Sequence, residues 1–302
     1  MNLLVTGAWS DAQAHIPELK RMGHEMSFLQ QEQDALPCAC EWVEGVICNG
    51  LFLHHPIERF VNLRYIQLTS AGYDRVPMDY IEAHGIEIHN ARSVYSIPMA
   101  EFVISGVLQL YKRAEAFRRN QREHRWVKQR DLLELSGKTV LIVGCGSVGT
   151  ECAKRFAAFG CQVTGINTDG RANEACSRTV SMASLDEELP RADVVVLTLP
   201  LTEQTRHLLD AKRMRRMKDG AALVNIARGA IMDEAALIQE LPRLGGAVLD
   251  VFQEEPLSED SPLWDAENVI VTPHNSFVGD GRSLRLGREI FRNLSKRNKC
   301  EE

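Results

Sequence analysis

The chain has 302 residues, of which 44% are apolar and 25% charged, a composition typical of a globular protein of roughly two domains. Its formal net charge of −6 disfavours a protein that binds nucleic acid through a basic face. We expect no membrane span, because no apolar run approaches the roughly 18 residues of a span. We also expect no signal peptide, which favours a cytoplasmic protein. The eight cysteines form no paired CxxC units, so we expect reduced thiols and no metal site.

The first third of the chain alternates short apolar runs with segments long enough for a helix. The predicted strands cover residues 2–7, 26–29, 45–48, 65–69 and 86–89. Strands that alternate with helices indicate βαβ units and a parallel sheet. This part of the chain therefore predicts one small, open α/β domain.

Residues 98–122 differ from the preceding pattern. Pro98 suits a first helical turn, and apolar side chains such as Val103, Val107 and Tyr111 then recur at helical spacing. We predict one long amphipathic helix that connects two domains.

A second series of apolar runs begins at Lys138. The predicted strands cover residues 139–143, 162–166, 193–199, 221–226, 247–251 and 269–272, with a shorter one at 179–182. The tail at 284–294 has the apolar spacing of a helix, and we interpret it as returning to the first domain. The second domain, residues 97–276, is then inserted between the two parts of the first, 1–96 and 277–302.

The strand at 139–143 runs into the sequence Gly144-Cys145-Gly146-Ser147-Val148-Gly149, and a helical stretch follows. This is the GxGxxG pattern in its strand–turn–helix context. The first glycine permits the tight turn, the second lets the backbone approach a pyrophosphate, and the third lets helix and strand pack closely. The N–H groups of the helix N-terminus then face the anion, so the turn predicts dinucleotide binding.

The next strand, 162–166, is expected to end beside the adenosine ribose. NAD-selective proteins usually have a carboxylate there, whereas this chain has Asn167 followed by Thr168, Asp169 and Arg171. A neutral side chain does not repel a 2′-phosphate, and Arg171 can pair with one, which favours NADP(H). Asp169 can instead take the role of the carboxylate.

Charged side chains lie at the ends of three predicted strands of the second series. Arg228 follows the strand at 221–226, Asp250 and Glu255 lie at the end of the next one, and His274 follows the last. Ligands gather at the carboxyl ends of strands in open α/β sheets. Each residue alone could be an ordinary surface or loop residue, but their joint placement in a chain with a dinucleotide turn indicates a catalytic site.

Together, these segments resemble the D-isomer-specific 2-hydroxyacid dehydrogenase family. The resemblance rests on residues 135–149, 192–202, 224–234, 250–256 and 272–274, with further similar segments at 69–74 and 98–102. It implies two doubly wound parallel-sheet α/β domains, a flavodoxin-like substrate domain and an inserted Rossmann cofactor domain. It also implies a homodimer packed through the cofactor domain, to which residues 98–126 could contribute.

Carried over by position, the resemblance implies that Arg228, Glu255 and His274 are the catalytic residues. Arg228 would bind the oxygens of a 2-oxoacid, His274 would exchange the proton, and Glu255 would stabilise and orient the imidazolium. The implied cofactor contacts are Gly144, Gly146, Ser147, Val148, Gly149, Asn167, Thr168, Arg171, Pro200, Thr205, Ile226, Ala227, Asp250 and Met99. Of these, Ser147 and Val148 would lie against the pyrophosphate, and Pro200 and Thr205 would border the adenosine or ribose. Ile226, Ala227 and Asp250 would lie near the nicotinamide, where Asp250 would accept from its carboxamide and Met99 would pack on its ring. The implied substrate contacts are Leu51, Ser70, Ala71, Gly72, Arg228 and His274.

The resemblance implies a reductase of small 2-oxoacids that uses NADP(H) or NAD(H) and forms D-2-hydroxyacids. In having a neutral residue at 167 and an arginine shortly after it, the chain resembles glyoxylate and hydroxypyruvate reductases. The alternative is a non-enzymatic, NAD(H)-sensing binding protein, like the corepressors that share this fold. The intact set of Arg228, Glu255 and His274 disfavours that alternative.

Overall fold

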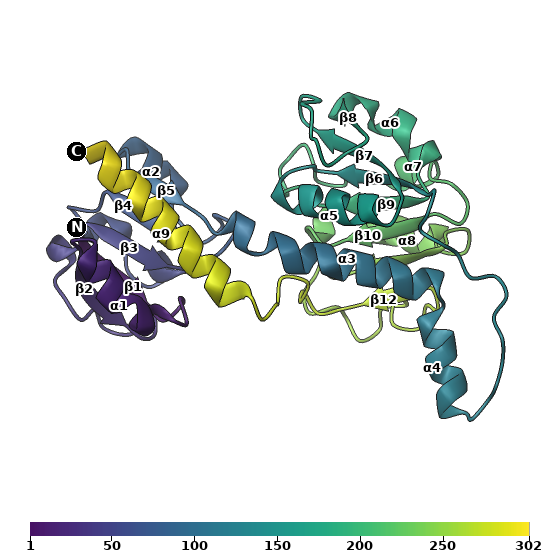
Figure 1. Cartoon of the computed structure of the whole chain (residues 1–302), viewed down its shortest axis with the longest axis horizontal. Helices are drawn as coiled ribbons and strands as arrows, with labels where there is room; N and C mark the ends of the chain where they lie inside the picture. Colours follow the sequence, from purple (N-terminus) through teal and green to yellow (C-terminus); the bar gives the residue numbers. More distant parts are fainter. Residues whose placement is uncertain (302) are drawn as a thin grey trace. The chain divides into compact units, whose positions relative to one another are not determined.

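The computed structural model describes residues 1–301, and the side chains of residues 1–297. The chain divides into two compact units (Figure 1): Met1–Tyr95 with Gly279–Glu302, and Ser96–Val278. Each unit is built around its own parallel β-sheet, so the predicted α/β fold class is confirmed. The first unit is discontinuous in sequence, because the whole second unit is inserted into it.

The first unit contains a five-stranded sheet in the order β2-β1-β3-β4-β5, in which all neighbouring strands are parallel. Its strands are β1 (Asn2–Thr6), β2 (Glu25–Leu29), β3 (Gly45–Cys48), β4 (Tyr65–Leu68) and β5 (Glu87–His89), and its α-helices are α1 (Ala12–Arg21), α2 (Met78–Ala83) and α9 (Arg282–Glu301). The three central strands are almost completely buried. Burial on both faces explains why their sequences are nearly continuous apolar runs.

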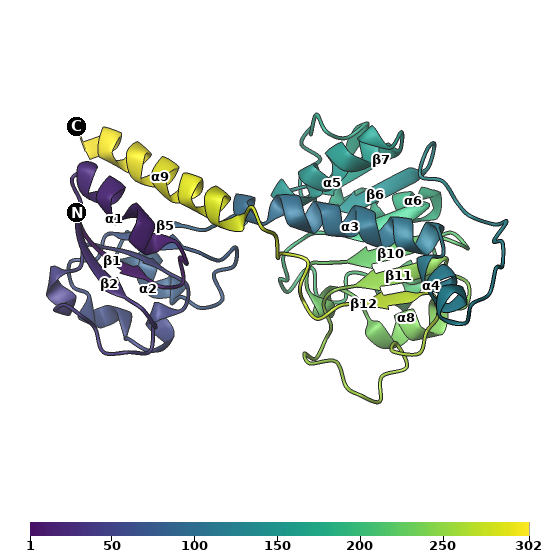
Figure 2. The ribbon, with the colours of Figure 1, turned by 60° about the horizontal axis from the view of Figure 1, so that its bottom comes forward.

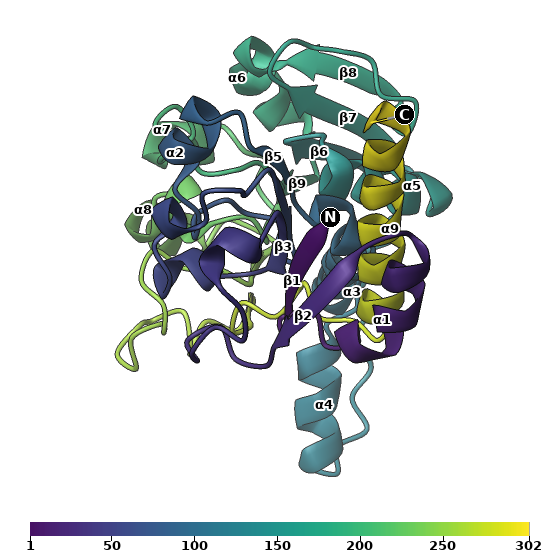
Figure 3. The same ribbon diagram turned by 90° about the vertical axis from the view of Figure 1, so that its left-hand side faces the viewer.

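The C-terminal helix α9 packs on this sheet beside α1 (Figure 3). Phe291 of α9 meets the ring of Trp9 edge to face, with 6.0 Å between the ring centroids. The buried amide of Asn293 donates a hydrogen bond to Gln67 on β4 at 2.8 Å. The helical spacing at residues 284–294 is therefore used for packing within the first unit.

The second unit contains a seven-stranded parallel sheet in the order β12-β11-β10-β9-β6-β7-β8. Figure 2 shows the edge strand β12 followed by β11 and β10, with β6 and β7 further along the sheet. Its strands are β6 (Thr139–Val143), β7 (Gln162–Asn167), β8 (Arg178–Ser181), β9 (Val194–Leu197), β10 (Ala222–Asn225), β11 (Gly246–Leu249) and β12 (Val269–Val271). Its helices are α3 (Ser96–Tyr111), α4 (Ala114–Arg122), α5 (Ser147–Ala158), α6 (Leu185–Glu188), α7 (Ala211–Met214) and α8 (Glu234–Glu240). The strand order reverses between β6 and β9, the position at which open α/β sheets bind ligands.

The segment predicted as one long helix, residues 98–122, forms two helices. α3 ends at Tyr111 and α4 begins at Ala114, with Arg113 between them in the left-handed conformation at φ +50°. α3 is apolar and largely buried, whereas α4 is mostly polar or charged and buries only Asn120. The prediction of a continuous helix was wrong because the apolar sheet face ends near the end of α3. The chain beyond it leaves the sheet (Figures 1 and 3).

Residues Arg92–Tyr111 are long and apolar enough to cross a membrane by length and composition alone. This corrects the expectation that no run approaches the length of a span. Half of this segment is buried inside the structure, where α3 packs against α5 and the strands β10 and β11. Packing in the core therefore accounts for its apolar character.

Candidate active site

The turn between β6 and α5 contains three glycines with different structural requirements. Gly144 has φ +100°, and a Cβ there would lie 2.6 Å from the backbone nitrogen of Leu199. A Cβ on Gly149 would lie 2.6 Å from the carbonyl oxygen of Gly144. A Cβ on Gly146 would meet no atom within 4 Å. Packing therefore requires Gly144 and Gly149, whereas Gly146 borders open space.

The first turn of α5 fits the pyrophosphate of a dinucleotide. Ser147 is the first residue of α5, and its hydroxyl oxygen is buried without a hydrogen-bond partner in the described part of the chain. A phosphate oxygen would accept from this hydroxyl and from the N–H groups at the helix N-terminus, where the helix dipole favours an anion. The open space at Gly146 and this unpartnered hydroxyl thus fit the group, which Ser147 and Val148 would hold.

The loop after β9 lies next to this turn. The hydroxyl of Thr198 donates to the carbonyl oxygen of Gly144 at 2.8 Å. Further along the loop, the hydroxyl of Thr205 donates to the carbonyl oxygen of Pro200 at 2.8 Å. Pro200 and Thr205, which were expected to border the adenosine or ribose, are therefore held together in the loop that adjoins the glycine turn.

Asn167 is the last residue of β7, at the position predicted to meet the ribose. Its side-chain nitrogen donates to the carbonyl oxygen of Arg171 at 2.7 Å, while its Oδ1 is buried without a partner among the residues described. Arg171 is 81% exposed and pairs with Asp169 at 3.2 Å. The backbone N–H and the guanidinium of Arg171 lower the pKa of the Asp169 carboxyl. At the end of β7, these residues and the exposed Thr168 therefore provide a buried acceptor that has no partner in the described part of the chain and a solvent-exposed cation.

Arg228 follows β10 and is exposed, and its Nη1 donates to the carbonyl oxygen of Ala227 at 2.7 Å. The buried Asn225 fixes this turn, because its Oδ1 accepts from the N–H of Ala227 and its amide donates to the carbonyl oxygen of Arg228, both at 3.1 Å. A Cβ on Gly229 would lie 1.8 Å from the backbone carbonyl carbon of Phe252. The turn that carries Arg228 therefore lies directly against the chain that follows β11.

His274 and Glu255 contact each other through His274 Nδ1, which lies 2.8 Å from a carboxylate oxygen of Glu255. The second carboxylate oxygen accepts from the backbone N–H of Phe252 at 3.1 Å, which fixes the carboxylate. Both side chains stay partly exposed, by 42% for the histidine and 37% for the glutamate. Because Nδ1 faces Glu255, Nε2 is the nitrogen that can exchange a proton with a ligand.

The side chain of Asp250 holds the loop that carries His274 through hydrogen bonds. Its fully buried carboxylate accepts from the hydroxyl of Thr272 at 2.6 Å and from the backbone N–H groups of Asn275 and Ser276 at 2.8 and 2.9 Å. His274 has φ +50°, a conformation uncommon for residues other than glycine. The expectation for Asp250 was a contact with the nicotinamide carboxamide, and the sequence analysis missed its role in positioning this loop.

The second unit thus brings Arg228, Glu255 and His274 to the carboxyl ends of β10, β11 and β12, which are neighbouring strands. Ile226 and Ala227, the other residues expected near the nicotinamide, are buried immediately after β10. Met99 belongs to α3 of this same unit, is half-buried, and packs against the core beneath α3 and α5.

The expected substrate residues Leu51, Ser70, Ala71 and Gly72 belong to the first unit. Leu51 is fully buried in the core of that unit, so its side chain does not reach the surface. Side-chain hydrogen bonds help to fix the loop after β4: the Ser70 hydroxyl donates to the carbonyl oxygen of Gly72 at 3.1 Å, and the Asn90 amide donates to that of Ala71 at 2.7 Å.

A parallel sheet with a glycine-rich turn at its switch point, and with Arg, Glu and His at three strand ends, is the arrangement expected of a dinucleotide-binding domain with a candidate catalytic site. The sequence profile described as D-isomer specific 2-hydroxyacid dehydrogenase, NAD binding domain, matches residues 104–276, more than half of the chain. The chain belongs to this family, and its second unit contains the NAD(P)-binding domain.

Individual relatives support the same assignment. The (S)-sulfolactate dehydrogenase of Chromohalobacter salexigens is 36% identical over 234 residues, which cover 76% of each chain. The glyoxylate reductase of Thermofilum pendens is 32% identical over 241 residues, 77% of this chain and 71% of the relative. A family structure from Xanthobacter autotrophicus in complex with NADPH and MES matches with a TM-score of 0.79 and 29% identity, covering 100% of this chain and 96% of that one.

We expect Gly146→Ala to weaken dinucleotide binding by at least about tenfold while the melting temperature stays unchanged. The added Cβ enters open space beside the turn, and the φ of −82° at this position suits alanine. Fluorescence titrations with NADPH and NADH measure the affinity. Gly149→Ala is the matched control, because its Cβ would meet the Gly144 carbonyl oxygen and lower the melting temperature. Unchanged affinity in Gly146→Ala would contradict this placement of the pyrophosphate.

Proposed function

We propose that this chain is an oxidoreductase that transfers hydride between NAD(P)H and a small 2-oxoacid, forming a D-2-hydroxyacid. The observation that carries the proposal is the 2.8 Å contact between His274 Nδ1 and Glu255, beside the strand end that presents Arg228. An imidazole backed by a carboxylate, together with an exposed guanidinium, meets the chemical needs of a ketone that adjoins a carboxylate. A turn that fits the dinucleotide lies in the same unit.

Each of the three side chains has a separate task in this reaction. The planar guanidinium of Arg228 binds the substrate carboxylate and ketone oxygen, and it stabilises the negative charge that grows on that oxygen. Glu255 orients the ring of His274 and stabilises its imidazolium form, so that Nε2 donates its proton to the ketone oxygen. In the oxidative direction, the neutral imidazole accepts this proton. When bound, the nicotinamide dinucleotide supplies or accepts the hydride.

We propose a 2-oxoacid of the glyoxylate or hydroxypyruvate type as the substrate. The glyoxylate reductase of T. pendens, at 32% identity, supports this class. The small residues of the loop Ser70-Ala71-Gly72 support close approach of a substrate carboxylate to backbone N–H groups. The carbonyl oxygens of Ser70 and Ala71 accept from the N–H of Ala91 at 2.8 Å and from Asn90 at 2.7 Å, which holds the loop in one conformation.

We propose NADP(H) as the preferred dinucleotide. Asn167 is neutral, so it places no negative charge beside the ribose. The guanidinium of Arg171 is exposed, so a 2′-phosphate can contact it. The carbonyl of Arg171 is tied to Asn167 at 2.7 Å, which keeps this cation near the end of β7. A 2′-phosphate carries more charge than the Asp169 carboxylate, so it would displace Asp169 from its pair with Arg171.

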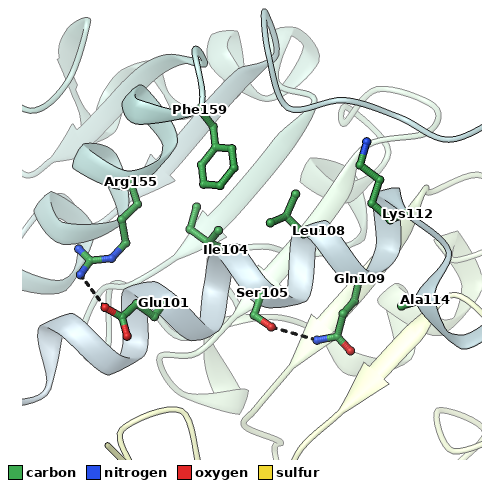
Figure 4. A pocket seen from close by; sticks show the side chains of 9 residues that line it. All are labelled: Glu101, Ile104, Ser105, Leu108, Gln109, Lys112, Ala114, Arg155 and Phe159. Carbon is green, nitrogen blue, oxygen red and sulfur yellow. Dashed lines mark hydrogen bonds and ion pairs between the residues drawn. The ribbon is translucent and has the colours of Figure 1, made fainter. Parts of the chain in front are cut away.

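We propose that the chain forms a homodimer through its second unit. The exposed apolar side chains near α4 and at the end of α5 are Phe117, Trp126, Val127, Leu132, Leu133 and Phe159. Beside them a hollow of about 630 Å³ runs along the outer face of α3 (Figure 4), lined in part by Ile104, Leu108 and Phe159. It contains none of the candidate site residues. Exposed apolar surface of this kind suits a protein partner, and a second copy supplies matching residues by symmetry.

The oxidoreductase proposal predicts that the protein oxidises NADPH or NADH with a 2-oxoacid. A spectrophotometric screen of glyoxylate, hydroxypyruvate, pyruvate and bulkier 2-oxoacids measures this. We expect His274→Ala to lower kcat by about 10²–10⁴-fold with unchanged dinucleotide affinity, because it removes the proton donor alone. His84→Ala, an exposed histidine of the first unit, is the control with normal turnover. Inactivity on every 2-oxoacid, or normal kcat in His274→Ala, would refute the proposal.

The dinucleotide preference depends on Arg171. We expect Arg171→Ala to lower kcat/KM for NADPH by about tenfold, the value of one charge-assisted contact, and to leave that for NADH nearly unchanged. Asp169→Asn is the matched variant, and it raises kcat/KM for NADPH because Arg171 loses its competing partner. Equal losses with both dinucleotides in Arg171→Ala would show that this residue does not contact a 2′-phosphate.

The homodimer depends on the apolar side chains around α4. Light scattering after size-exclusion chromatography should give twice the chain mass of 33.9 kDa for the unaltered protein. Trp126→Glu places a charge on a side chain that is 95% exposed, and we expect it to yield monomers at micromolar concentration. Trp264→Glu, at a residue 52% exposed elsewhere in the same unit, should remain dimeric. A monomeric unaltered protein, or a dimeric Trp126→Glu variant, would reject this interface.

A further inference from the structure

Two cysteine thiols meet beside the glycine turn, although 31 positions separate them in the sequence. The Sγ atoms of Cys145, within the turn, and Cys176, in the loop between β7 and β8, lie 3.3 Å apart. Cys145 is buried, and Cys176 is partly exposed. Gly165 on β7 makes room for both, because a Cβ there would lie 2.7 Å from the sulfur of Cys176 and 2.9 Å from that of Cys145.

The loop that carries Cys176 is held against the turn by polar contacts. The amide of Asn173 donates to the hydroxyl of Thr150 in α5 at 2.7 Å, and it lies 3.4 Å from the carbonyl oxygen and 3.3 Å from the sulfur of Cys145. The known roles of the three glycines in a GxGxxG turn account for residues 144, 146 and 149. They do not require a thiol at position 145. Two thiols held in contact in this way are placed so that a disulfide can form between them.

We propose that Cys145 and Cys176 form a redox modification site that closes to a reversible intrachain disulfide. Closure requires the two sulfurs to approach from 3.3 Å to about 2.05 Å, a shift that rotation of the two side chains and a small movement of the loop can provide. The bond would join the glycine turn to the loop that also carries Arg171.

The two thiols have different roles in closure. The hydrogen bond between them lowers the pKa of the Cys176 thiol, whereas the same contact together with burial raises the pKa of the Cys145 thiol. Cys176 is also the more exposed of the two. It is therefore the thiol that meets an oxidant from solution, and Cys145 is the thiol that resolves the intermediate.

The oxidant is a small-molecule disulfide such as oxidised glutathione. The Cys176 thiolate, after losing its proton to solvent, attacks one sulfur of the oxidant, and a mixed disulfide forms while the other half leaves as a thiolate. Cys145 then loses its proton and attacks the sulfur of Cys176, which releases the second half. In total, the protein loses two hydrogens and two small thiols form. A small dithiol reverses the process by the same exchange.

Closure should also affect binding of the dinucleotide, a consequence that rests on the proposed function. Drawing the turn and the loop of Arg171 together alters the position of the backbone that would hold the pyrophosphate and the ribose. We expect the disulfide form to bind NADPH more weakly by roughly fivefold or more. Because such coupling is reciprocal, saturating NADPH should disfavour disulfide formation by the same factor.

The test of the site uses the full-length protein equilibrated in mixtures of oxidised and reduced glutathione. Free thiols are then alkylated, and the protein is digested and analysed by mass spectrometry. We expect a peptide that links Cys145 to Cys176, lost after reduction. Cys145→Ser and Cys176→Ser should each abolish the link, and Cys38→Ser, at another partly exposed thiol, should retain it. Glutathione that stays attached to Cys176, or a link to any other cysteine, would overturn the proposal.

This measurement requires no turnover, so it is independent of the proposed function. The coupling is measured separately, by fluorescence titration of NADPH into the oxidised and reduced protein. Cys145→Ser serves as the control, because its NADPH affinity should not change with the ratio of oxidised to reduced glutathione. Thermal unfolding shows that this variant is folded. Equal NADPH affinity in the disulfide and dithiol forms would overturn the coupling, and the linked peptide would still establish the modification site.

Discussion

The buried carboxylate of Asp250 is the constraint on which the candidate active site depends. It accepts hydrogen bonds from Thr272, Asn275 and Ser276, on both sides of His274. Each hydrogen bond to a charged acceptor contributes about 1.5–3 kcal/mol. The left-handed conformation of His274 costs roughly 1–2 kcal/mol. Three such bonds outweigh this strain, so the histidine stays in a conformation that the chain would otherwise avoid.

The other two catalytic candidates share a second stretch of backbone. Phe252 donates its N–H to Glu255, and the same residue lies so close to Gly229 that no side chain fits between them. The turn of Arg228 and the carboxylate of Glu255 are therefore fixed against one segment, the chain that follows β11. Asp250 begins this same segment and also holds the loop of His274. The positions of all three side chains therefore depend on contacts among the loops that follow three adjacent strands, and not on any single loop.

Features that depend on local sequence could be predicted from it, and features that depend on distant contacts could not. The buried parallel strands are continuous apolar runs, and the turn at Gly144 follows from glycine spacing. The pattern therefore predicted α/β domains with parallel sheets, and the family resemblance added their doubly wound type. The break at Arg113 depends on where the sheet surface ends, which the helical spacing of residues 98–122 does not record. The donors to Asp250 come from more than twenty positions away. Cys145 meets Cys176 because β6 pairs with β7 and because Asn173 holds the loop after β7 against the turn.

The order of strands in the second sheet separates the catalytic candidates from the residues proposed to bind the pyrophosphate and the ribose. Arg228, Glu255 and His274 follow β10, β11 and β12, whereas Asn167 and the thiol pair adjoin β6 and β7 on the other side of β9. A change at the thiols therefore acts on the turn after β6 and the loop after β7, and β9 separates these strands from β10, the nearest strand that leads to a catalytic candidate. Such a change can alter how tightly a dinucleotide is held while the contact between His274 and Glu255 stays intact. The proposed regulation at the thiols and the proposed catalysis at the strand ends thus use different strands of one sheet.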